Sequence, residues 1–201
     1  MDKELEQLRE AVAGGSRRHQ VILQKCGIGK VNAALGTQRM IEQHHPDLII
    51  STGCAGGAGK DLHVADVVVS NKVAYHDVYC GPEVHQGQVQ GLPAVYQSPE
   101  ELVQKAVKTG AVPGMIASGD WFVDSAEQMQ RILERQPEAI AVDMESAAIA
   151  QTCWLNKVPF LSLRIISDLP FQENNTLQYN DFWATIANGS FRATKAFIDQ
   201  L

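Results

Sequence analysis

Short apolar runs that alternate with helical patterns constrain the fold of this chain more than any other feature. Residues 48–52 (Leu-Ile-Ile-Ser-Thr) have the length and composition of a strand buried on both faces, and they run directly into the glycine-rich segment 53–57. Similar runs lie at 115–118, 139–142 and 160–166, with helical patterns between them. This alternation predicts an α/β fold around a mixed, mostly parallel central sheet flanked by helices. In such sheets, ligands bind at the carboxyl ends of the strands.

The same patterns predict the other elements. Helices are expected at 4–12, 30–43, 98–108, 125–136, 146–156 and 181–200, the last weakened at Asn188-Gly189. Further strands are expected at 67–70 and 73–75, residues 77–97 are expected to form a long loop, and 53–57 a turn or ligand-binding loop. Ser98 with Glu101 and Ser125 with Gln128 are typical of capping boxes. A length of 201 residues, without repeats or a linker, predicts one domain over 1–201.

Composition excludes several classes of function. Seventeen Lys and Arg against 23 Asp and Glu give a net charge of −6, which argues against nucleic-acid binding. No apolar stretch approaches the roughly 18 residues that a membrane span needs. The four cysteines are too widely spaced for a C-x-x-C motif, and the first ten residues are charged rather than apolar. Reduced thiols in a cytoplasmic protein without a secretory signal are therefore expected.

Several motifs that would indicate a cofactor, a metal or a nucleophile are incomplete. Gly27-Ile28-Gly29 lacks the third glycine of a dinucleotide-binding fingerprint, and neither glycine segment continues as a phosphate-binding P-loop. The histidines have no zinc-ligand spacing, and a G-x-S-x-G elbow is absent. Cys54 could act as a nucleophile, but no base is encoded beside it. We expect no cofactor and no metal.

Carboxylates follow the apolar runs at four places. Asp120, Asp143, Glu145 and Asp168 all lie at or just beyond the end of an expected strand. Each one alone could be a helix cap or could stabilise a helix N-terminus. Together they indicate a site at the carboxyl edge of the sheet.

Four stretches of the chain resemble the 5'-methylthioadenosine/S-adenosylhomocysteine nucleosidases, which are members of the nucleoside phosphorylase superfamily. These stretches are Gly27-Ile28-Gly29-Lys30-Val31, Thr52-Gly53-Cys54-Ala55-Gly56-Gly57, Ala141-Val142-Asp143-Met144-Glu145 and Arg164-Ile165-Ile166-Ser167-Asp168, in order and register from about Cys26 to Leu201. The resemblance implies a nucleoside phosphorylase-like fold. It also implies hydrolysis of the N-glycosidic bond of 5'-methylthioadenosine, S-adenosylhomocysteine or 5'-deoxyadenosine.

The resemblance also implies roles for individual residues. Asp168 would protonate N7 of the purine, Ser167 would orient that carboxyl group, and Glu4 would be the base that activates water. Phe122 would stack on the purine, and Val123 would read the adenine edge. Met144 would lie against the ribose, and Glu145 would bind its hydroxyls. The other substrate contacts would come from Cys54, Ala55 and Gly56 in the glycine segment, and from Ile28 with Met1 near the 5'-substituent. This chemistry fits a bond cleavage that passes through an oxocarbenium-like transition state.

The chain also departs from the family's pattern. The family has a strand before the segment that begins here at Met1, and a longer stretch in place of Ala13 to Gln20, so the sheet is expected to lack its first strand or the recorded start lies too late. The resemblance further suggests a homodimer in which the loop from Tyr79 to Val95 closes the partner's 5'-substituent pocket.

Other functions remain open on the sequence alone. A phosphorylase of the same superfamily would need a group of cationic side chains to bind phosphate. Arg164 alone is a weak candidate for that role. Hydrolysis of related nucleosides such as aminodeoxyfutalosine would use the same reacting groups. A catalytically impaired nucleoside-binding protein is the alternative outside catalysis.

Overall fold

The computed structural model describes residues 2–12, 19–173, 175–186 and 191–201 as one α/β domain built on a six-stranded sheet. The strand order is β3-β2-β4-β5-β1-β6, and an additional pairing between β2 and β6 closes all of these strands except β3 into a ring. The pairings β1–β6, β2–β4 and β4–β5 are parallel, and β1–β5, β2–β3 and β2–β6 are antiparallel. The longer ladders are the parallel ones, so the prediction of a mixed, mostly parallel sheet is confirmed.

The strands follow the apolar runs, with some differences in extent. They are β1 (Ile49–Gly57), β2 (Val67–Tyr75), β3 (Tyr96–Gln97), β4 (Val112–Ser118), β5 (Ala139–Asp143) and β6 (Phe160–Asp168). The two strands expected at 67–70 and 73–75 form one strand, because a register shift between Ser70 and Lys72 lets β2 continue past Asn71 along β4. The long loop that was expected lies between β2 and β3.

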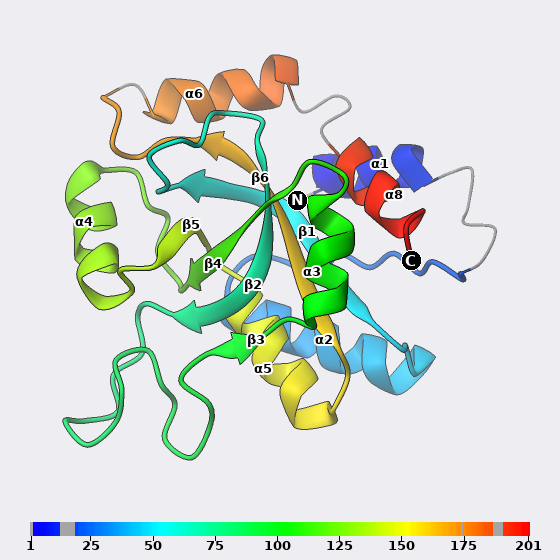
Figure 1. Ribbon diagram of the computed structural model, residues 1–201, viewed down its shortest axis with the longest axis horizontal. Helices are drawn as coiled ribbons and strands as arrows, with labels where there is room; N and C mark the ends of the chain where they lie inside the picture. Colours follow the sequence, from blue (N-terminus) through cyan, green and yellow to red (C-terminus); the bar gives the residue numbers. More distant parts are fainter. Residues whose placement is uncertain (1, 13–18, 174, 187–190) are drawn as a thin grey trace.

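The helices cover the sheet in separate groups (Figure 1). They are α1 (Asp2–Val12), α2 (Lys30–His44), α3 (Glu100–Val107), α4 (Ala126–Arg135), α5 (Ser146–Asn156), α6 (Asn175–Asp181), the π-helical turn η1 (Phe182–Ile186) and α8 (Arg192–Ile198). Helices α2 and α5 pack together on one side of the sheet, and α1 packs on α8 near the two chain ends.

The segment 53–57 is not a turn, which was one of the two readings that the sequence left open, but the end of a strand. Strand β1 runs through it, pairing with β6 as far as Gly56 and with β5 at Gly56 and Gly57. A Cβ atom at Gly57 would lie 2.7 Å from the Leu169 side chain, and one at Gly56 would lie 3.2 Å from Pro170 and Val142. These glycines therefore allow close packing inside a strand rather than a change of direction.

Before Gly56, strand β1 is paired on one side only. From Ile49 to Ala55 it pairs with β6, and no strand of the described residues pairs with its other edge. This leaves the edge of β1 beside a cavity.

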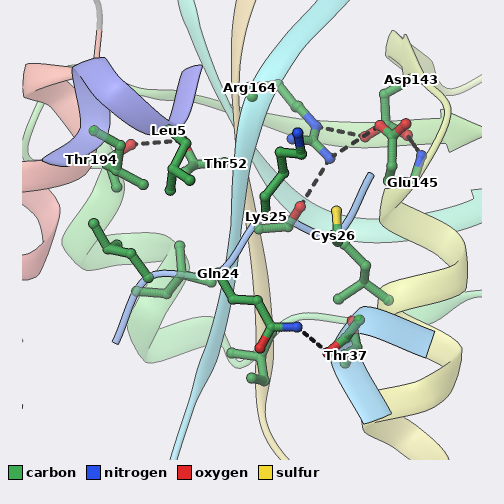
Figure 2. Close-up of a pocket in the computed structure, with 18 of the residues that line it drawn as sticks. Leu5, Gln24, Lys25, Cys26, Thr37, Thr52, Asp143, Glu145, Arg164 and Thr194 are labelled. Carbon is green, nitrogen blue, oxygen red and sulfur yellow. Dashed lines mark hydrogen bonds and ion pairs between the residues drawn. The ribbon is translucent and has the colours of Figure 1, made fainter. Parts of the chain in front are cut away.

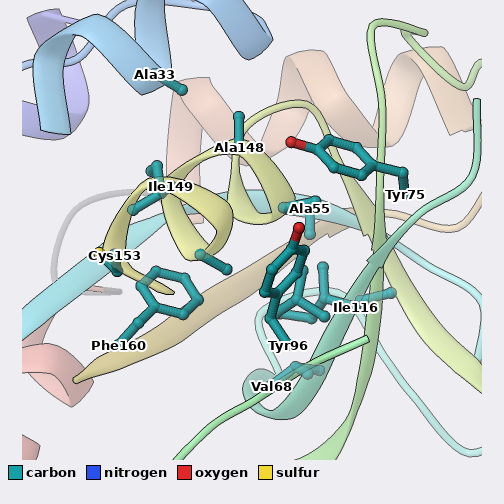
Figure 3. Packing of buried hydrophobic residues seen from close by; sticks show 14 of the residues in the cluster. Ala33, Ala55, Val68, Tyr75, Tyr96, Ile116, Ala148, Ile149, Cys153 and Phe160 are labelled. Atoms are coloured by element: carbon teal, nitrogen blue, oxygen red, sulfur yellow. The ribbon is translucent and has the colours of Figure 1, made fainter. Parts of the chain in front are cut away.

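Small residues on α5 bring it close to the sheet and to α2 (Figure 3). Ala148, Ile149 and Cys153 of α5 belong to the same buried cluster as Ala33 of α2 and Phe160 of β6. Close approach of these layers fixes the start of α5, which follows the carboxyl end of β5 directly.

One of the two predicted capping boxes is wrong. The Ser125 side chain accepts a hydrogen bond from the backbone N–H of Gln128 at 3.3 Å and caps α4 as expected. At α3 the capping position is Pro99, without a side-chain cap, because the Ser98 hydroxyl is hydrogen-bonded to that of Ser70 at 2.9 Å.

The prediction of one closing helix over 181–200 is also wrong. Helix α6 begins at Asn175, before the expected start, and the π-helical turn η1 follows it directly. The last helix is the short α8, while the weak point expected at Asn188-Gly189 lies outside the described residues.

Candidate active site

A cavity of about 870 Å³ lies along the unpaired edge of β1 and reaches the carboxyl ends of β5 and β6. Residues 19–28 and residues 48–56 both line it. Its volume is in the usual range of small-molecule sites, roughly 300–1,000 Å³. The carboxyl edge of the sheet, where the sequence predicts a ligand site, therefore holds a cavity of suitable size.

Asp168 is the carboxylate at the end of β6, and it lines this cavity. It is only 6% exposed, and this burial raises the pKa of Asp168 to about 6. The Ser167 hydroxyl donates a hydrogen bond to Asp168 Oδ1 at 2.7 Å and also lies 3.3 Å from the carbonyl oxygen of Ala55. The hydrogen bond from Ser167 lowers the pKa and fixes the orientation of the carboxyl group. A carboxyl group with this pKa is well suited to give up a proton near neutral pH.

Glu145 lies in the turn between β5 and α5, where it lines the same cavity. Its Oε1 accepts a hydrogen bond from the backbone N–H of Gly29 at 3.0 Å. Gly29 precedes α2, so this carboxylate meets the positive end of the helix. Because a carboxylate can accept several hydrogen bonds, Glu145 keeps acceptor capacity for ligand hydroxyl groups.

Arg164 and Asp143, which both line the cavity, form a buried ion pair in its wall (Figure 2). Arg164 Nε donates to Asp143 Oδ2 at 2.6 Å, and Arg164 Nη2 donates to the hydroxyls of Ser51 at 2.9 Å and Ser146 at 3.1 Å. Burial raises the pKa of Asp143, but the Arg164 charge and hydrogen bonds to the carboxylate outweigh it and hold the pKa below its ordinary value. Arg164 is therefore already bound to protein groups, and this argues against a role in binding phosphate.

Aromatic and aliphatic side chains line another part of the cavity. Phe122 is 55% exposed and meets Tyr179 edge-on, with ring centroids 5.4 Å apart. Tyr179 in turn lies edge-on to Trp183, at 6.3 Å. Val123 and the half-buried Met144 also line the cavity. This wall offers apolar surface and ring faces to a planar heterocycle.

The structure brings most of the remaining predicted residues to the same cavity. Cys54, Ala55 and Gly56 of β1 line it, as does the exposed Ile28. Glu4 falls in α1, whose residues Leu5 and Leu8 line the cavity, but its side chain and the whole of Met1 lie outside the described part of the structure.

Asp120 is the one strand-end carboxylate that does not line the cavity. Its Oδ1 accepts a hydrogen bond from the backbone N–H of Lys30 at 2.8 Å, and its own backbone N–H donates to Asp77 Oδ2 at 2.9 Å. Asp77 Oδ2 also forms an ion pair with Lys30 Nζ at 2.7 Å. Asp120 therefore binds the start of α2, which is the capping role that each carboxylate could have had on its own.

Sequence reasoning missed several lining residues. Tyr179 and Trp183 lie in the region of the misassigned helix, although aromatic residues at 179, 182 and 183 have helical spacing that could have indicated them. Cys26 also lines the cavity, and burial raises the pKa of its thiol. The backbone N–H of Gly29 could not have been found from sequence, because its role depends on the approach of α2 to Glu145.

The described residues hold neither a group of metal ligands nor a membrane-spanning helix. Within residues 2–12, 19–173, 175–186 and 191–201, no three His, Cys, Asp or Glu side chains are grouped so that they could hold a metal ion. In the same residues, no helix combines the length and hydrophobicity needed to cross a bilayer.

Comparisons with known proteins show the family of this chain. The model of the phosphorylase superfamily matches residues 5–199. The 5'-methylthioadenosine/S-adenosylhomocysteine nucleosidase of Staphylococcus aureus strain MRSA252 is 39% identical over 189 residues, which cover 90% of this chain and 82% of that protein.

Solved structures give the same result. A 5'-methylthioadenosine/S-adenosylhomocysteine nucleosidase from Neisseria meningitidis, in complex with methylthio-immucillin-A, superposes with a TM-score of 0.88 at 35% identity, covering 100% of this chain and 96% of that one. The futalosine hydrolase of Helicobacter pylori strain 26695 superposes with a TM-score of 0.86 at 27% identity, covering 100% and 95%. With a family match over nearly its whole length, the chain belongs to the phosphorylase superfamily and, within it, to the 5'-methylthioadenosine/S-adenosylhomocysteine nucleosidases.

Proposed function

We propose that the protein hydrolyses the N-glycosidic bond of 5'-substituted adenosines, releasing adenine and the 5'-substituted ribose. The substrates are 5'-methylthioadenosine, S-adenosylhomocysteine and 5'-deoxyadenosine. The observation that carries this proposal is the buried carboxyl group of Asp168, with its pKa raised to about 6, in the same cavity as Glu145.

The reaction needs an acid on the leaving group and a base on water. Asp168 gives its proton to N7 of the purine, the bond from C1' to N9 breaks, and its electron pair leaves with the adenine. Water attacks C1' and loses a proton to Glu4. Glu145 binds the 2' and 3' hydroxyls of the ribose, where its carboxylate also stabilises the developing positive charge on the sugar.

The other lining residues bind the nucleoside. Phe122 stacks on the purine, and the backbone of Val123 reads its edge. Met144 lies against the ribose, with Cys54, Ala55 and Gly56 behind it, and Ile28 with Met1 receives the 5'-substituent. The aromatic wall formed by Phe122 and Tyr179 supports the placement of the purine.

A direct test is product analysis with 5'-methylthioadenosine, in phosphate-free buffer and again with phosphate. Equal adenine release in both buffers is the expected result, because Arg164 is already bound to Asp143, Ser51 and Ser146. Release that requires phosphate would assign a phosphorylase instead. Binding without release would assign a nucleoside-binding protein.

Variants test the catalytic assignments. Asp168→Asn is expected to lower kcat by about 10² to 10⁴, the usual contribution of a general acid, while nucleoside affinity survives. Glu4→Gln is expected to lower kcat on the same scale. Glu6→Gln is the matched control for Glu4, because residues two apart on a helix point in different directions and Glu6 is exposed. Unchanged turnover in Asp168→Asn would remove the assignment of the acid.

A second candidate substrate is a futalosine-type nucleoside. The structural similarity to the futalosine hydrolase of Helicobacter pylori supports keeping it, since the same acid and ribose-binding groups would serve. Comparing kcat/KM for 5'-methylthioadenosine and aminodeoxyfutalosine distinguishes the two.

The assembly that we propose is a cytoplasmic homodimer, in which the loop from Tyr79 to Val95 closes the 5'-substituent pocket of the partner. Tyr79 is 67% exposed, and Ile28, Val31 and Leu35 are also largely exposed, so apolar surface is available for an interface. None of the four cysteines, all in described segments, forms a disulfide, which suits a reducing compartment. Light scattering measures the mass in solution, and a monomer at assay concentration would contradict the dimer.

A further inference from the structure

Asp143 connects three elements that surround the proposed ribose site, although its own side chain is only 1% exposed. Its Oδ1 accepts hydrogen bonds from the backbone N–H groups of Glu145 at 3.4 Å and of Ser146 at 3.2 Å. Its Oδ2 accepts from Arg164 Nε, and also from the Ser146 hydroxyl. One carboxylate therefore holds the turn that carries Glu145, the start of α5 and the side chain of Arg164 on β6.

Arg164 lies between two carboxylates at unequal distances. Its Nε is 2.6 Å from Asp143 Oδ2, whereas its Nη2 is 4.0 Å from Glu145 Oε2. The hydroxyl of Ser51 accepts a hydrogen bond from the same Nη2 at 2.9 Å and holds it in place. A charge-assisted hydrogen bond from an arginine to a carboxylate is about 2.8 Å long, so a shift of about 1 Å would close Arg164 onto Glu145.

We infer that Asp143 is a positioning residue that sets the selectivity for ribose hydroxyls, by binding Arg164 and so keeping the Glu145 carboxylate available to the 2'-hydroxyl. The inference rests on the proposed role of Glu145. A tight pair between Arg164 and Glu145 would compete with the substrate for the same carboxylate oxygens. Removal of the charge on Asp143 releases Arg164 toward Glu145, which is the nearby carboxylate at 4.0 Å.

The charge on Asp143 is present under ordinary assay conditions. Burial alone would raise the pKa of this carboxyl group, but Arg164 and the donors around it keep the pKa below the ordinary value. The contacts on Asp143 therefore act on an ionised group at neutral pH.

The test measures kcat and KM of Asp143→Asn with 5'-methylthioadenosine and with its 2'-deoxy analogue. We expect kcat/KM for the ribonucleoside to fall about 10- to 100-fold, mainly through KM, and kcat/KM for the 2'-deoxy analogue to change less than about threefold. The preference for the ribonucleoside then drops at least about tenfold. Equal losses for both substrates would assign Asp143 a structural role only and overturn the inference.

Rescue and folding controls complete the test. Asp143→Glu keeps the charge and is expected to restore part of the preference. Asp143→Asn leaves Arg164 without its nearest charged partner and so threatens folding. Ser51→Ala is the milder second variant, because it removes only one of the two hydrogen bonds that hold Nη2. It is expected to lower the preference about threefold, and an unchanged preference in a folded Ser51→Ala protein counts against the inference. Ile132 is a buried residue of α4, in a core cluster that does not include Asp143. Ile132→Val controls for a general loss of stability and is expected to leave the preference for the ribonucleoside unchanged.

Glu145→Gln separates this inference from the proposed function. If Glu145→Gln abolishes the ribose preference and Asp143→Asn does not, the inference about Asp143 is wrong and the role of Glu145 stands. If Glu145→Gln leaves the preference intact, the role of Glu145 is wrong and the inference fails with it.

Discussion

The Ser167 hydroxyl donates a hydrogen bond to Asp168 Oδ1 at 2.7 Å, so the carboxyl group that burial makes more basic is also held in one orientation. These two effects oppose each other on the pKa. Burial favours the neutral acid, and the hydrogen bond favours the carboxylate. Burial is the larger effect, which leaves the pKa of Asp168 at about 6.

The first prediction concerns the dependence of activity on pH. In the proposed mechanism the reactive free enzyme carries protonated Asp168. We therefore expect kcat/KM to fall tenfold per pH unit above about pH 6, the value to which burial raises the pKa of this group. The measurement is kcat/KM for 5'-methylthioadenosine between pH 5 and about 9 at constant ionic strength. A flat profile over this range would contradict Asp168 as the acid.

The second prediction concerns Ser167→Ala. The hydrogen bond from Ser167 lowers the pKa of Asp168, so its removal raises that pKa further. The alkaline limb of the kcat/KM profile should move up by roughly 1 pH unit, since a hydrogen bond to a charged group contributes about 1.5 kcal/mol or more. We also expect a lower plateau, because the carboxyl group loses a contact that orients it. A limb that stays in place or moves to lower pH would show that the hydroxyl does not act on Asp168.

The third prediction concerns the stability of Asp168→Asn. Below about pH 4 both the folded and the unfolded protein hold the proton on Asp168, and the group has no effect. Between about pH 4 and pH 6 only the unfolded state releases it, so stability falls as the pH rises, and the loss persists above pH 6. An asparagine side chain cannot ionise, so the variant is expected to be more stable than the parent by about 2 kcal/mol at pH 7.5 and similar to it near pH 4.

Denaturant unfolding at both pH values measures this difference. Asp61→Asn, at an exposed position that does not line the cavity, is the control and is expected to show no such dependence on pH. Equal stability of Asp168→Asn and the parent at pH 7.5 would show that Asp168 carries no burial penalty.

Much of the fold could be predicted from the sequence because buried strands are continuous apolar runs. Those at 115–118, 139–142 and 160–166 each fall inside a strand. The errors arise where an element depends on distant partners. Gly56 and Gly57 look like a turn until β5, β6 and Leu169 are present to pack against them. Ser98 has the pattern of a cap, yet its hydroxyl is hydrogen-bonded to Ser70, which is remote in sequence.

The carboxylates of the candidate site could be predicted from the sequence, but most of the contacts that hold them in place could not. Asp143, Glu145 and Asp168 follow buried strands, and the topology brings those strand ends to one cavity. Asp120 follows a strand too, but its carboxylate binds the start of α2 and does not line the cavity. Which carboxylate faces a ligand and which binds a helix depends on the three-dimensional approach of α2, and a local sequence pattern does not encode that approach.

The last prediction concerns Gly29→Ala, at the point where α2 approaches Glu145. Gly29 has φ +85°, and a Cβ atom there would lie 2.9 Å from Asp120 Oδ1, while its backbone N–H donates to Glu145 Oε1. With ψ 166°, Gly29 lies in a region that is essentially restricted to glycine, so alanine is strained there by roughly 1–3 kcal/mol. Its methyl group also pushes against the carboxylate that binds Lys30. The displaced N–H then holds Glu145 less well, so KM should rise about tenfold, the equivalent of about 1.4 kcal/mol.

Gly110→Ala is the matched control, because Gly110 has φ +94° with nothing within 4 Å of the added Cβ atom. It should lose stability through strain at a positive φ and keep its KM. An unchanged KM in Gly29→Ala would mean that the α2 terminus does not position Glu145.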